Sequence, residues 1–167
     1  MQKWNLSLIV AFDHQQALNT LVNQLNVLNL VNNINAIGHR VVHGGEHYSQ
    51  PTLINDDVKN TIENLAKLAP LHNPANLIGI NACQKAFPQL PQIAIFDTAF
   101  HQSMPEKAYL YGIPYALYNE HGIRRYGFHG TSHYFVANQA AKIMNKPLQD
   151  CNLISAHLGN GCSVTVI

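Results

Sequence analysis

Residues 92–97, QIAIFD, form a short and almost continuously apolar run that ends in an acidic residue. A run of this kind predicts a strand in a sheet that is covered on both faces. Helical patterns flank the run along the chain, and alternating strands and helices indicate an α/β fold. Asp97 follows the carboxyl end of the strand, where open α/β sheets bind ligands. Its carboxylate is expected either to hold Mg²⁺, directly or through water, or to cap the next turn.

The segments before this strand predict further elements of the same sheet. Asp13 is the predicted N-cap of an amphipathic helix within the first thirty residues, and its apolar positions recur at helical spacing: Leu18, Leu21, Val22, Leu25 and Leu28. Residues 34–42 are rich in β-branched side chains and predict a strand. A second helix is expected to open at Asn55 and to end before Pro70. A third is expected to run from Asn73 to about residue 87.

The segments after residue 97 predict a loop region, a helix and a hairpin. Residues 98–128 are rich in Pro, Gly and Tyr and are expected to form a long, structured loop region. Thr131–Met144 predicts a fourth helix, with Thr131 or Ser132 as its cap. Residues 152–157 and 162–167 predict two strands joined by a tight turn at 158–161.

The composition limits the classes of function. The chain has 167 residues, 47% of them hydrophobic, with a formal net charge of +1, so a folded core is expected and a basic nucleic-acid-binding surface is not. Apolar runs are too short for a membrane span, and no secretory signal is evident. The three cysteines form no C-x-x-C pair, which favours a reducing cytoplasm. Ten histidines, nine of them between His39 and His157, raise the expectation of an active site.

The stretch GHRVVHGGE, residues 38–46, places an arginine inside an apolar strand. We expect the Arg40 guanidinium to be buried and to bind an anion bidentately, because desolvating it alone costs too much free energy. The glycines at 44–45 would let the backbone approach a ligand closely. An Arg40–Glu46 structural pair, with the glycines only turning the chain, is equally compatible with the spacing. A zinc site is disfavoured because the intervening residues argue against a helix that would align the three histidines: His39, His43 and His47.

Three further motifs are compatible with anion binding. His72 precedes a helix N-terminus, although a capping or packing role for His72 and Asn73 is favoured. His129 lies between glycines on a predicted tight bend before a helix, where it would face a phosphoryl group. Ser132 beside histidines could suggest a hydrolase, but no Gly-x-Ser-x-Gly motif is present. The Gly-Asn-Gly turn at 159–161 offers backbone N–H groups to phosphate, yet such turns are also common in hairpins.

Five strings, taken together and in order, resemble the acetate kinase family: HRVVHGGE at 39–46, APLHNP at 69–74, FDTAFH at 96–101, YGFHGTSH at 126–133 and HLGNG at 157–161. The resemblance extends from about Ile37 to the last residue. It implies an α/β, ribonuclease-H-like domain of the fold shared by acetate and sugar kinases, heat-shock ATPases and actin. It also implies a truncated arrangement: residues 1–150 would be an N-terminal domain incomplete at its start, and 151–167 the first hairpin of a C-terminal nucleotide-binding domain.

The resemblance implies reversible phosphoryl transfer from ATP to acetate, giving acetyl phosphate and ADP, a step of acetyl-CoA biosynthesis. By the same resemblance Arg40 binds acetate or the phosphoryl group, Asp97 is the essential acid, and His129 stabilises the transferring group. The implied substrate pocket consists of Arg40, Val42, Leu71, His72 and Phe128. The implied ATP-phosphate loop consists of His157, Leu158, Gly159, Asn160 and Gly161. Acetate is already ionised at neutral pH, so Asp97 is expected to fix Mg²⁺ or to orient Arg40 rather than act as a base.

The resemblance further implies Mg²⁺ or Mn²⁺ as cofactor, ATP/ADP as co-substrate, a homodimeric parent protein and a cytoplasmic location, without nucleic-acid or membrane partners. The family's opening strand with its asparagine, and its serine-rich phosphate hairpin, are missing from this sequence. Its second arginine, adenosine site and metal-binding glutamate would follow Ile167. The alternatives are a propionate or butyrate kinase of the same family, or an inactive, poorly folded fragment.

Overall fold

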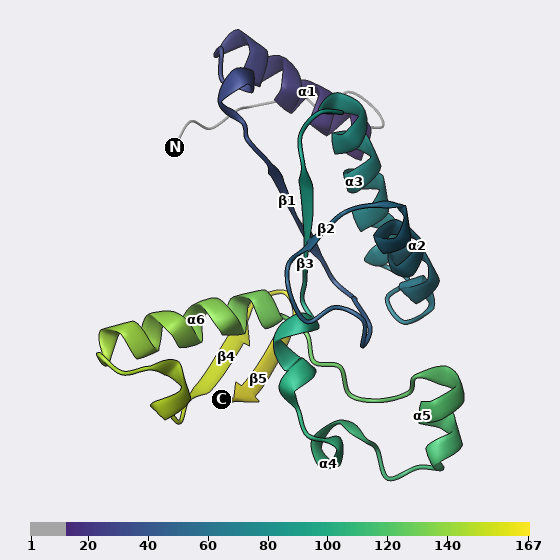
Figure 1. The fold of residues 1–167 in the computed structure, drawn as a ribbon, viewed down its shortest axis with the longest axis vertical. Helices are drawn as coiled ribbons and strands as arrows, with labels where there is room; N and C mark the ends of the chain where they lie inside the picture. Colours follow the sequence, from purple (N-terminus) through teal and green to yellow (C-terminus); the bar gives the residue numbers. More distant parts are fainter. Residues whose placement is uncertain (1–12) are drawn as a thin grey trace.

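The computed structural model describes residues 13–167, in which strands and helices alternate as the sequence predicted (Figure 1). A three-stranded sheet has the order β1-β3-β2, formed by β1 (Ile37–Val41), β2 (Thr52–Leu53) and β3 (Gln92–Phe96). Strands β1 and β3 are parallel, and β2 is antiparallel to β3. The sequence did not indicate β2, which has only two residues. The expectation that no strand precedes the first helix falls on residues 1–12, outside the described residues.

The helices of the first half begin where their capping residues predicted. Helix α1 (His14–Val27) opens with a capping box between Asp13 and Gln16. Helix α2 (Asp56–Asn64) opens at Asn55, whose side chain accepts a hydrogen bond from the Val58 N–H. It ends in a 3₁₀ turn before Pro70. Helix α3 (Asn73–Ala86) connects this region to β3 and makes β1-α2-α3-β3 a crossover between parallel strands.

The loop region predicted at 98–128 contains a 3₁₀ turn (Ala99–Ser103) and the short helices α4 (Glu106–Tyr109) and α5 (Tyr115–His121). A buried arginine, Arg124, connects this loop region to the loop after β1. The Arg124 guanidinium pairs with Glu46 and lies 3.6 Å from the centre of the Tyr109 ring. The Tyr118 hydroxyl donates a second hydrogen bond to Glu46 at 3.0 Å. These contacts with Glu46 hold the segment 122–129 near the carboxyl end of β1.

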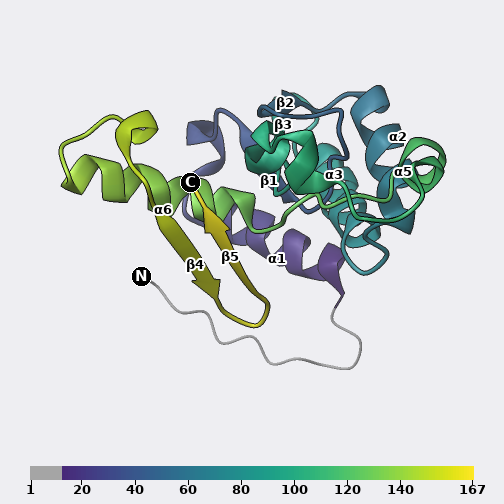
Figure 2. The same ribbon diagram turned by 90° about the horizontal axis from the view of Figure 1, so that it is seen from below.

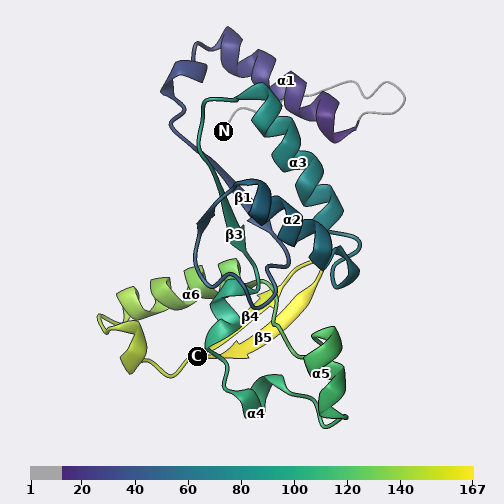
Figure 3. The same cartoon turned by 45° about the vertical axis from the view of Figure 1, so that its right-hand side comes forward.

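Helix α6 (Gly130–Ile143) lies along a separate two-stranded sheet, β4 (Ile154–Leu158) and β5 (Cys162–Val166) (Figures 2 and 3). The hairpin forms as predicted, but the predicted cap of α6 is wrong. The N-cap residue is His129, and it makes no side-chain capping bond. The hairpin turns its polar side chains toward α6 and leaves its apolar side chains exposed: Ile154, Leu158, Val164 and Val166. No helix within residues 13–167 has the length and hydropathy needed to cross a bilayer.

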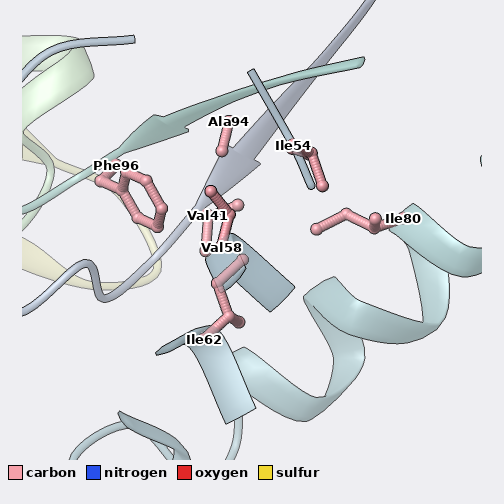
Figure 4. Packing of buried hydrophobic residues seen from close by; sticks show 7 residues of the cluster. All are labelled: Val41, Ile54, Val58, Ile62, Ile80, Ala94 and Phe96. Atoms are coloured by element: carbon pink, nitrogen blue, oxygen red, sulfur yellow. The ribbon is translucent and has the colours of Figure 1, made fainter. Parts of the chain in front are cut away.

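The main core lies between one face of the three-stranded sheet and the helices α2 and α3 (Figure 4). Its buried members are Val41, Ile54, Val58, Ile62, Ile80, Ala94 and Phe96. Ile93 and Ile95 point to the opposite face and are only half-buried. The prediction of a sheet covered on both faces is therefore wrong for the described residues, because α2 and α3 cover the Ala94–Phe96 side only.

Candidate functional site

The carboxyl ends of β1 and β3 bring Arg40 and Asp97 together. The two strands are in register from Ile37↔Gln92 to Val41↔Phe96, and the Asp97 N–H donates to the Val41 carbonyl at 2.9 Å. Arg40 Nε donates to Asp97 Oδ1 at 3.0 Å, and Arg40 Nη2 donates to Asp97 Oδ2 at 2.6 Å. This bidentate pair fixes the plane of the guanidinium. The hydrogen bonds to Asp97 raise the pKa of Arg40 above its ordinary value.

The two partners differ sharply in exposure. The Asp97 side chain is 1% exposed, whereas the Arg40 side chain is 60% exposed. The prediction of a buried Arg40 is therefore wrong. The Arg40 side chain is exposed to solvent, and only Asp97 is buried. Arg40 Nη1 has no hydrogen-bond partner among residues 13–167 and can reach an external anion. The alternative Arg40–Glu46 pair is also wrong, because Glu46 pairs with Arg124.

Helix α6 begins directly at this carboxylate. The Gly130 N–H donates to the Asp97 carbonyl at 3.0 Å, and the Thr131 hydroxyl donates to Asp97 Oδ1 at 3.0 Å. The Thr131 hydroxyl thus binds Asp97 instead of capping the helix.

The glycines after β1 pack against the core. Gly44 and Gly45 are both buried. A Cβ on Gly44 would lie 2.6 Å from the Phe96 ring, so only glycine allows this close packing. The Gly44 N–H donates to the Thr98 hydroxyl at 3.1 Å. Packing on Phe96 therefore accounts for the glycine at position 44, and the approach of the backbone to a ligand stays a prediction.

The three histidines weighed as zinc ligands have separate environments. His39 Nε2 contacts Gln92 Oε1 at 2.8 Å, and His47 is exposed. His43 is buried, and its Nδ1 accepts a hydrogen bond from the Gly45 N–H at 3.0 Å. Burial lowers the pKa of His43 to about 4, so its ring is neutral. Within residues 13–167 no three His, Cys, Asp or Glu side chains are grouped so that they could hold a metal ion.

His129 lies on the predicted bend before α6, in a left-handed backbone conformation (φ 56°, ψ 24°). This conformation is strained for a residue with a side chain and is typical of functional positions. Its Nδ1 contacts the Ser163 hydroxyl at 2.8 Å, and its ring stacks on His157 with centroids 4.0 Å apart. Burial first, then the charge of His157, lowers the pKa of His129, so the ring is neutral near pH 7. The charges of Asp97 and Arg40 also act on this pKa, which reflects their proximity.

A cleft of about 500 Å³ opens beside His129 and is lined in part by Phe128, His43 and Leu68. Phe128 is 40% exposed and offers its ring to this cleft. Leu71, predicted for the substrate pocket, is 84% exposed and does not line the cleft, whereas Leu68 does. Nothing in the sequence distinguished Leu68 from Leu71.

The remaining predicted substrate residues lie at the N-terminal end of α3. The Val42 N–H donates to Asn76 Oδ1 at 3.1 Å, which anchors the chain just after β1. His72 occupies the N-cap position of α3 but is exposed and makes no capping bond. Asn73 is fully buried and has the packing role that the sequence favoured.

The predicted phosphate loop lies against His129. In the turn between β4 and β5, the Gly159 N–H donates to the Gly161 carbonyl at 3.0 Å. A Cβ on Gly161 would lie 3.4 Å from both Cε1 and Nε2 of His129, so the turn lies close to this edge of the ring. Leu158, by contrast, points outward and is exposed. The fold therefore brings the Gly-Asn-Gly turn and His129 into one place.

The Ser132 hydroxyl contacts His157 Nδ1 at 3.0 Å, whereas the serine of a Ser-His-acid triad is bonded to the histidine Nε2. No carboxylate within residues 13–167 is hydrogen-bonded to His157, so a Ser-His-acid triad is not formed there. Sequence reasoning missed three other polar members of this region, His133, Ser155 and Ser163. The only available signal was that Ser155 and Ser163 alternate with apolar residues along their strands.

Comparisons with known proteins agree with this geometry. The acetokinase family model matches residues 2–167. The acetate kinase of Shewanella sp. strain W3-18-1 is 58% identical over 156 residues, which are 92% of this chain and 39% of that protein. The propionate kinase structure from Francisella tularensis subsp. tularensis SCHU S4 matches with a TM-score of 0.88 and 51% identity, covering 92% of this chain and 40% of that one.

The acetate kinase structure from Porphyromonas gingivalis matches with a TM-score of 0.85 and 43% identity, over 93% of this chain and 40% of that one. These similarities confirm the predicted fold. The chain spans about two fifths of the length of the relatives it matches. On the family match and the shared fold, the chain belongs to the acetokinase family.

Proposed function

We propose that this chain provides the acyl- and phosphoryl-binding part of an acetate kinase, which transfers a phosphoryl group reversibly between ATP and acetate. One observation carries the proposal: the Arg40–Asp97 pair lies at the N-terminus of α6, next to His129. A fixed cation with free N–H groups, a neutral imidazole and a helix N-terminus thus converge on one small region. Together they suit an anion that carries charge on several oxygens.

The proposed mechanism depends on positioning. Acetate is ionised at neutral pH and needs no general base. Arg40 binds the acetate carboxylate and holds one oxygen in line with the γ-phosphorus of ATP. That oxygen forms the new P–O bond as the bond to the ADP oxygen breaks, and His129 donates a hydrogen bond to an equatorial oxygen of the transferring group. Asp97 orients Arg40, and Phe128, Val42 and Leu68 are proposed to contact the methyl group.

A divalent cation does not fit Asp97. Both of its oxygens already accept hydrogen bonds from Arg40, Oδ1 accepts another from Thr131, and the side chain is buried. Asp97 is therefore not proposed to hold Mg²⁺ or Mn²⁺. A cation that accompanies ATP would have to be bound by the nucleotide and by residues other than Asp97. For the phosphates of ATP we propose the hairpin residues 157–161, because their turn lies close to His129 and the His157 ring stacks on it.

The proposal is tested with a chimera in which this chain replaces the matching part of the Shewanella sp. strain W3-18-1 acetate kinase. Acetyl phosphate formed from ATP and acetate is trapped as its hydroxamate. Arg40→Ala or His129→Ala should lower kcat/KM by about 2–4 kcal/mol in transition-state free energy. His47→Ala, at an exposed position, serves as the control. Equal hydroxamate rates for the parent chimera and both variants would refute the assigned roles.

Propionate is the second candidate substrate, because one of the matching structures is a propionate kinase. One methylene changes binding by only about 1–3 kcal/mol, so a closely related pocket can accept either acid. The bulk of Val42 favours acetate. The ratio of kcat/KM values for acetate, propionate and butyrate decides the preference.

We also propose that residues 1–150 form an N-terminal domain and that 151–167 begin a nucleotide-binding domain. The separate sheet of β4 and β5 supports this division. For the parent protein we propose a cytoplasmic homodimer, and the 167-residue chain alone is expected to be inactive. Hydroxamate assays on the chain and the chimera test whether the chain alone is inactive. Light scattering tests the oligomeric state.

A further inference from the structure

Two neighbouring residues of the hairpin hold the His129 ring. His157 on β4 and Ser163 on β5 are directly opposite each other in the antiparallel ladder. His157 stacks on the face of the His129 ring, with an angle of 15° between the planes. The Ser163 hydroxyl contacts Nδ1 of the same ring at 2.8 Å. The position and the rotation of the imidazole are therefore both set by β4 and β5.

The Ser163 hydroxyl is also the middle of a longer chain of hydrogen bonds. It lies 2.9 Å from His133 Nε2, and His133 Nδ1 lies 2.9 Å from the Ser155 hydroxyl. His133 and Ser155 are both buried. The sequence of contacts Ser155–His133–Ser163–His129 thus runs from the interior between α6 and the hairpin out to the functional imidazole.

A serine hydroxyl has one hydrogen, so Ser163 donates to one of its two imidazole neighbours and accepts from the other. In the first arrangement His133 Nε2–H donates to Ser163, and Ser163 donates to His129 Nδ1. The proton of a neutral His129 is then on Nε2. In the second arrangement every bond is reversed, and His129 Nε2 has no proton to donate.

The two arrangements differ in function because Nε2 is the ring nitrogen on the side of the Gly-Asn-Gly turn, where a Cβ on Gly161 would lie 3.4 Å from it. In a neutral histidine, the hydrogen bond made by one ring nitrogen decides whether the proton is on that nitrogen or on the other. We propose that Ser163 is a positioning residue, which with His133 and Ser155 holds His129 with its proton on Nε2. The choice of this direction rests on the proposed function, in which Nε2–H donates to the phosphoryl group.

The protonation state of His129 is compatible with this role. The groups whose charges act on it are His157, Asp97, Arg40 and His101, and His133 is connected to it through Ser163. Burial and the surrounding positive charges oppose the imidazolium form, and only a neutral ring leaves Nδ1 free to accept from Ser163.

The direct test is the tautomer of His129, read from ¹⁵N chemical shifts of the ring nitrogens. Spectra are recorded in parallel on the 167-residue chain and on the chimera, so that a poorly folded isolated chain does not prevent the measurement. The parent should show a protonated Nε2 and an unprotonated Nδ1. Ser163→Ala should distribute the proton over both nitrogens, and Ser163→Thr should restore the parent signal. Ser49→Ala, at an exposed serine, is the control.

The kinetic test separates positioning from a merely structural role. In the chimera Ser163→Ala should lower kcat about 10–100-fold with the KM for acetate unchanged, and Ser163→Thr should recover most of the loss. A proton on Nδ1 in the parent, or an unchanged tautomer in Ser163→Ala, would overturn the proposal. A chimera without kinase activity would instead count against the proposed function, while the ¹⁵N spectra would still decide whether Ser163 sets the tautomer.

Discussion

At the scale of single residues, the Arg40–Asp97 pair shows how one ion pair serves two environments. The carboxylate is buried and accepts three hydrogen bonds, whereas the guanidinium keeps free N–H groups at the surface. A buried charge is tolerated only when it is paired and hydrogen-bonded, and Asp97 satisfies both conditions. The result is an arginine whose plane is fixed before any ligand arrives, which reduces the entropy lost on binding.

Asp97→Asn should therefore act through Arg40. The amide can no longer accept two charge-assisted hydrogen bonds, so the guanidinium loses its fixed orientation. We expect the KM for acetate to rise and the shape of the pH–rate profile near neutrality to stay the same, as measured by hydroxamate trapping in the chimera. Loss of an ionisation from that profile would show instead that Asp97 acts as a base.

Gly130→Ala tests the contact between α6 and β3. A Cβ at this position would overlap the carbonyl oxygen of Asp97, which is rigid backbone. We expect a loss of about 2 kcal/mol or more in the free energy of unfolding, measured by urea denaturation. Gly79→Ala in α3 is the matched control, because nothing lies within 4 Å of the place that a Cβ would take there, and alanine should stabilise this helix by about 0.5–1 kcal/mol. Equal changes in unfolding free energy for Gly130→Ala and Gly79→Ala would contradict the close contact of Gly130 with Asp97.

At the scale of elements, one asparagine joins three segments. Asn73 Oδ1 accepts from the His43 N–H at 3.1 Å, and Asn73 Nδ2 donates to the carbonyls of His43 and Ile62 at 3.1 and 3.0 Å. The start of α3 is thereby tied to the loop after β1 and to α2. This explains why an asparagine, and no hydrophobic residue, is fully buried at the first position of α3.

Asn73→Ala should leave these buried backbone groups without partners. Since each unsatisfied buried group costs about 1–3 kcal/mol, we expect a loss of about 3 kcal/mol in unfolding free energy, measured by chemical denaturation. Asn76→Ala removes a single bond, to the Val42 N–H, and should cost about 1 kcal/mol. The order of the two variants is the critical result: a larger loss for Asn76→Ala would contradict the role of Asn73.

At the scale of the whole molecule, several histidines are held neutral by burial. The pKa of His43 is lowered to about 4, and those of His129 and His133 are lowered as well. A lowered folded-state pKa means that the unfolded chain binds more protons below about 6.5, the value of an ordinary histidine. The stabilisation is thus present above pH 6.5 and is lost as the pH falls toward 4.

We therefore expect the free energy of unfolding to decrease on acidification from pH 6.5 to 4. His43 alone would contribute at most about 3 kcal/mol, and solvent screening lowers this value. Denaturation series across this window measure the slope. His43→Asn keeps an acceptor for the Gly45 N–H but cannot titrate, so its slope should be shallower. Replacement of the exposed His14 should leave the slope unchanged, and a slope insensitive to both changes would refute the assignment.

The predictable part of the structure was local. Helix starts at Asp13, Asn55 and Asn73, the strand at 92–96 and the hairpin turn at 158–161 all follow from capping, periodicity and turn chemistry within a few residues. The family and the bend at His129 followed from ordered motifs. These features depend on neighbours in sequence, which a single sequence displays directly.

The hydrogen-bond and ion-pair partners of the charged and polar groups could not be predicted from neighbours in sequence. Only the parallel register of β1 and β3 places Asp97, and not Glu46, beside Arg40, and only the packing of α6 on the hairpin brings Ser163 to His129. Polar and apolar residues alternate along β4 and β5, which indicates two faces of the hairpin. The alternation does not indicate which face packs on α6. The sequence thus determined the family and the longer elements, although not β2, α4 or α5, whereas tertiary structure alone decided the ion pairs, the exposed arginine and the histidine network. These contacts join residues tens of positions apart.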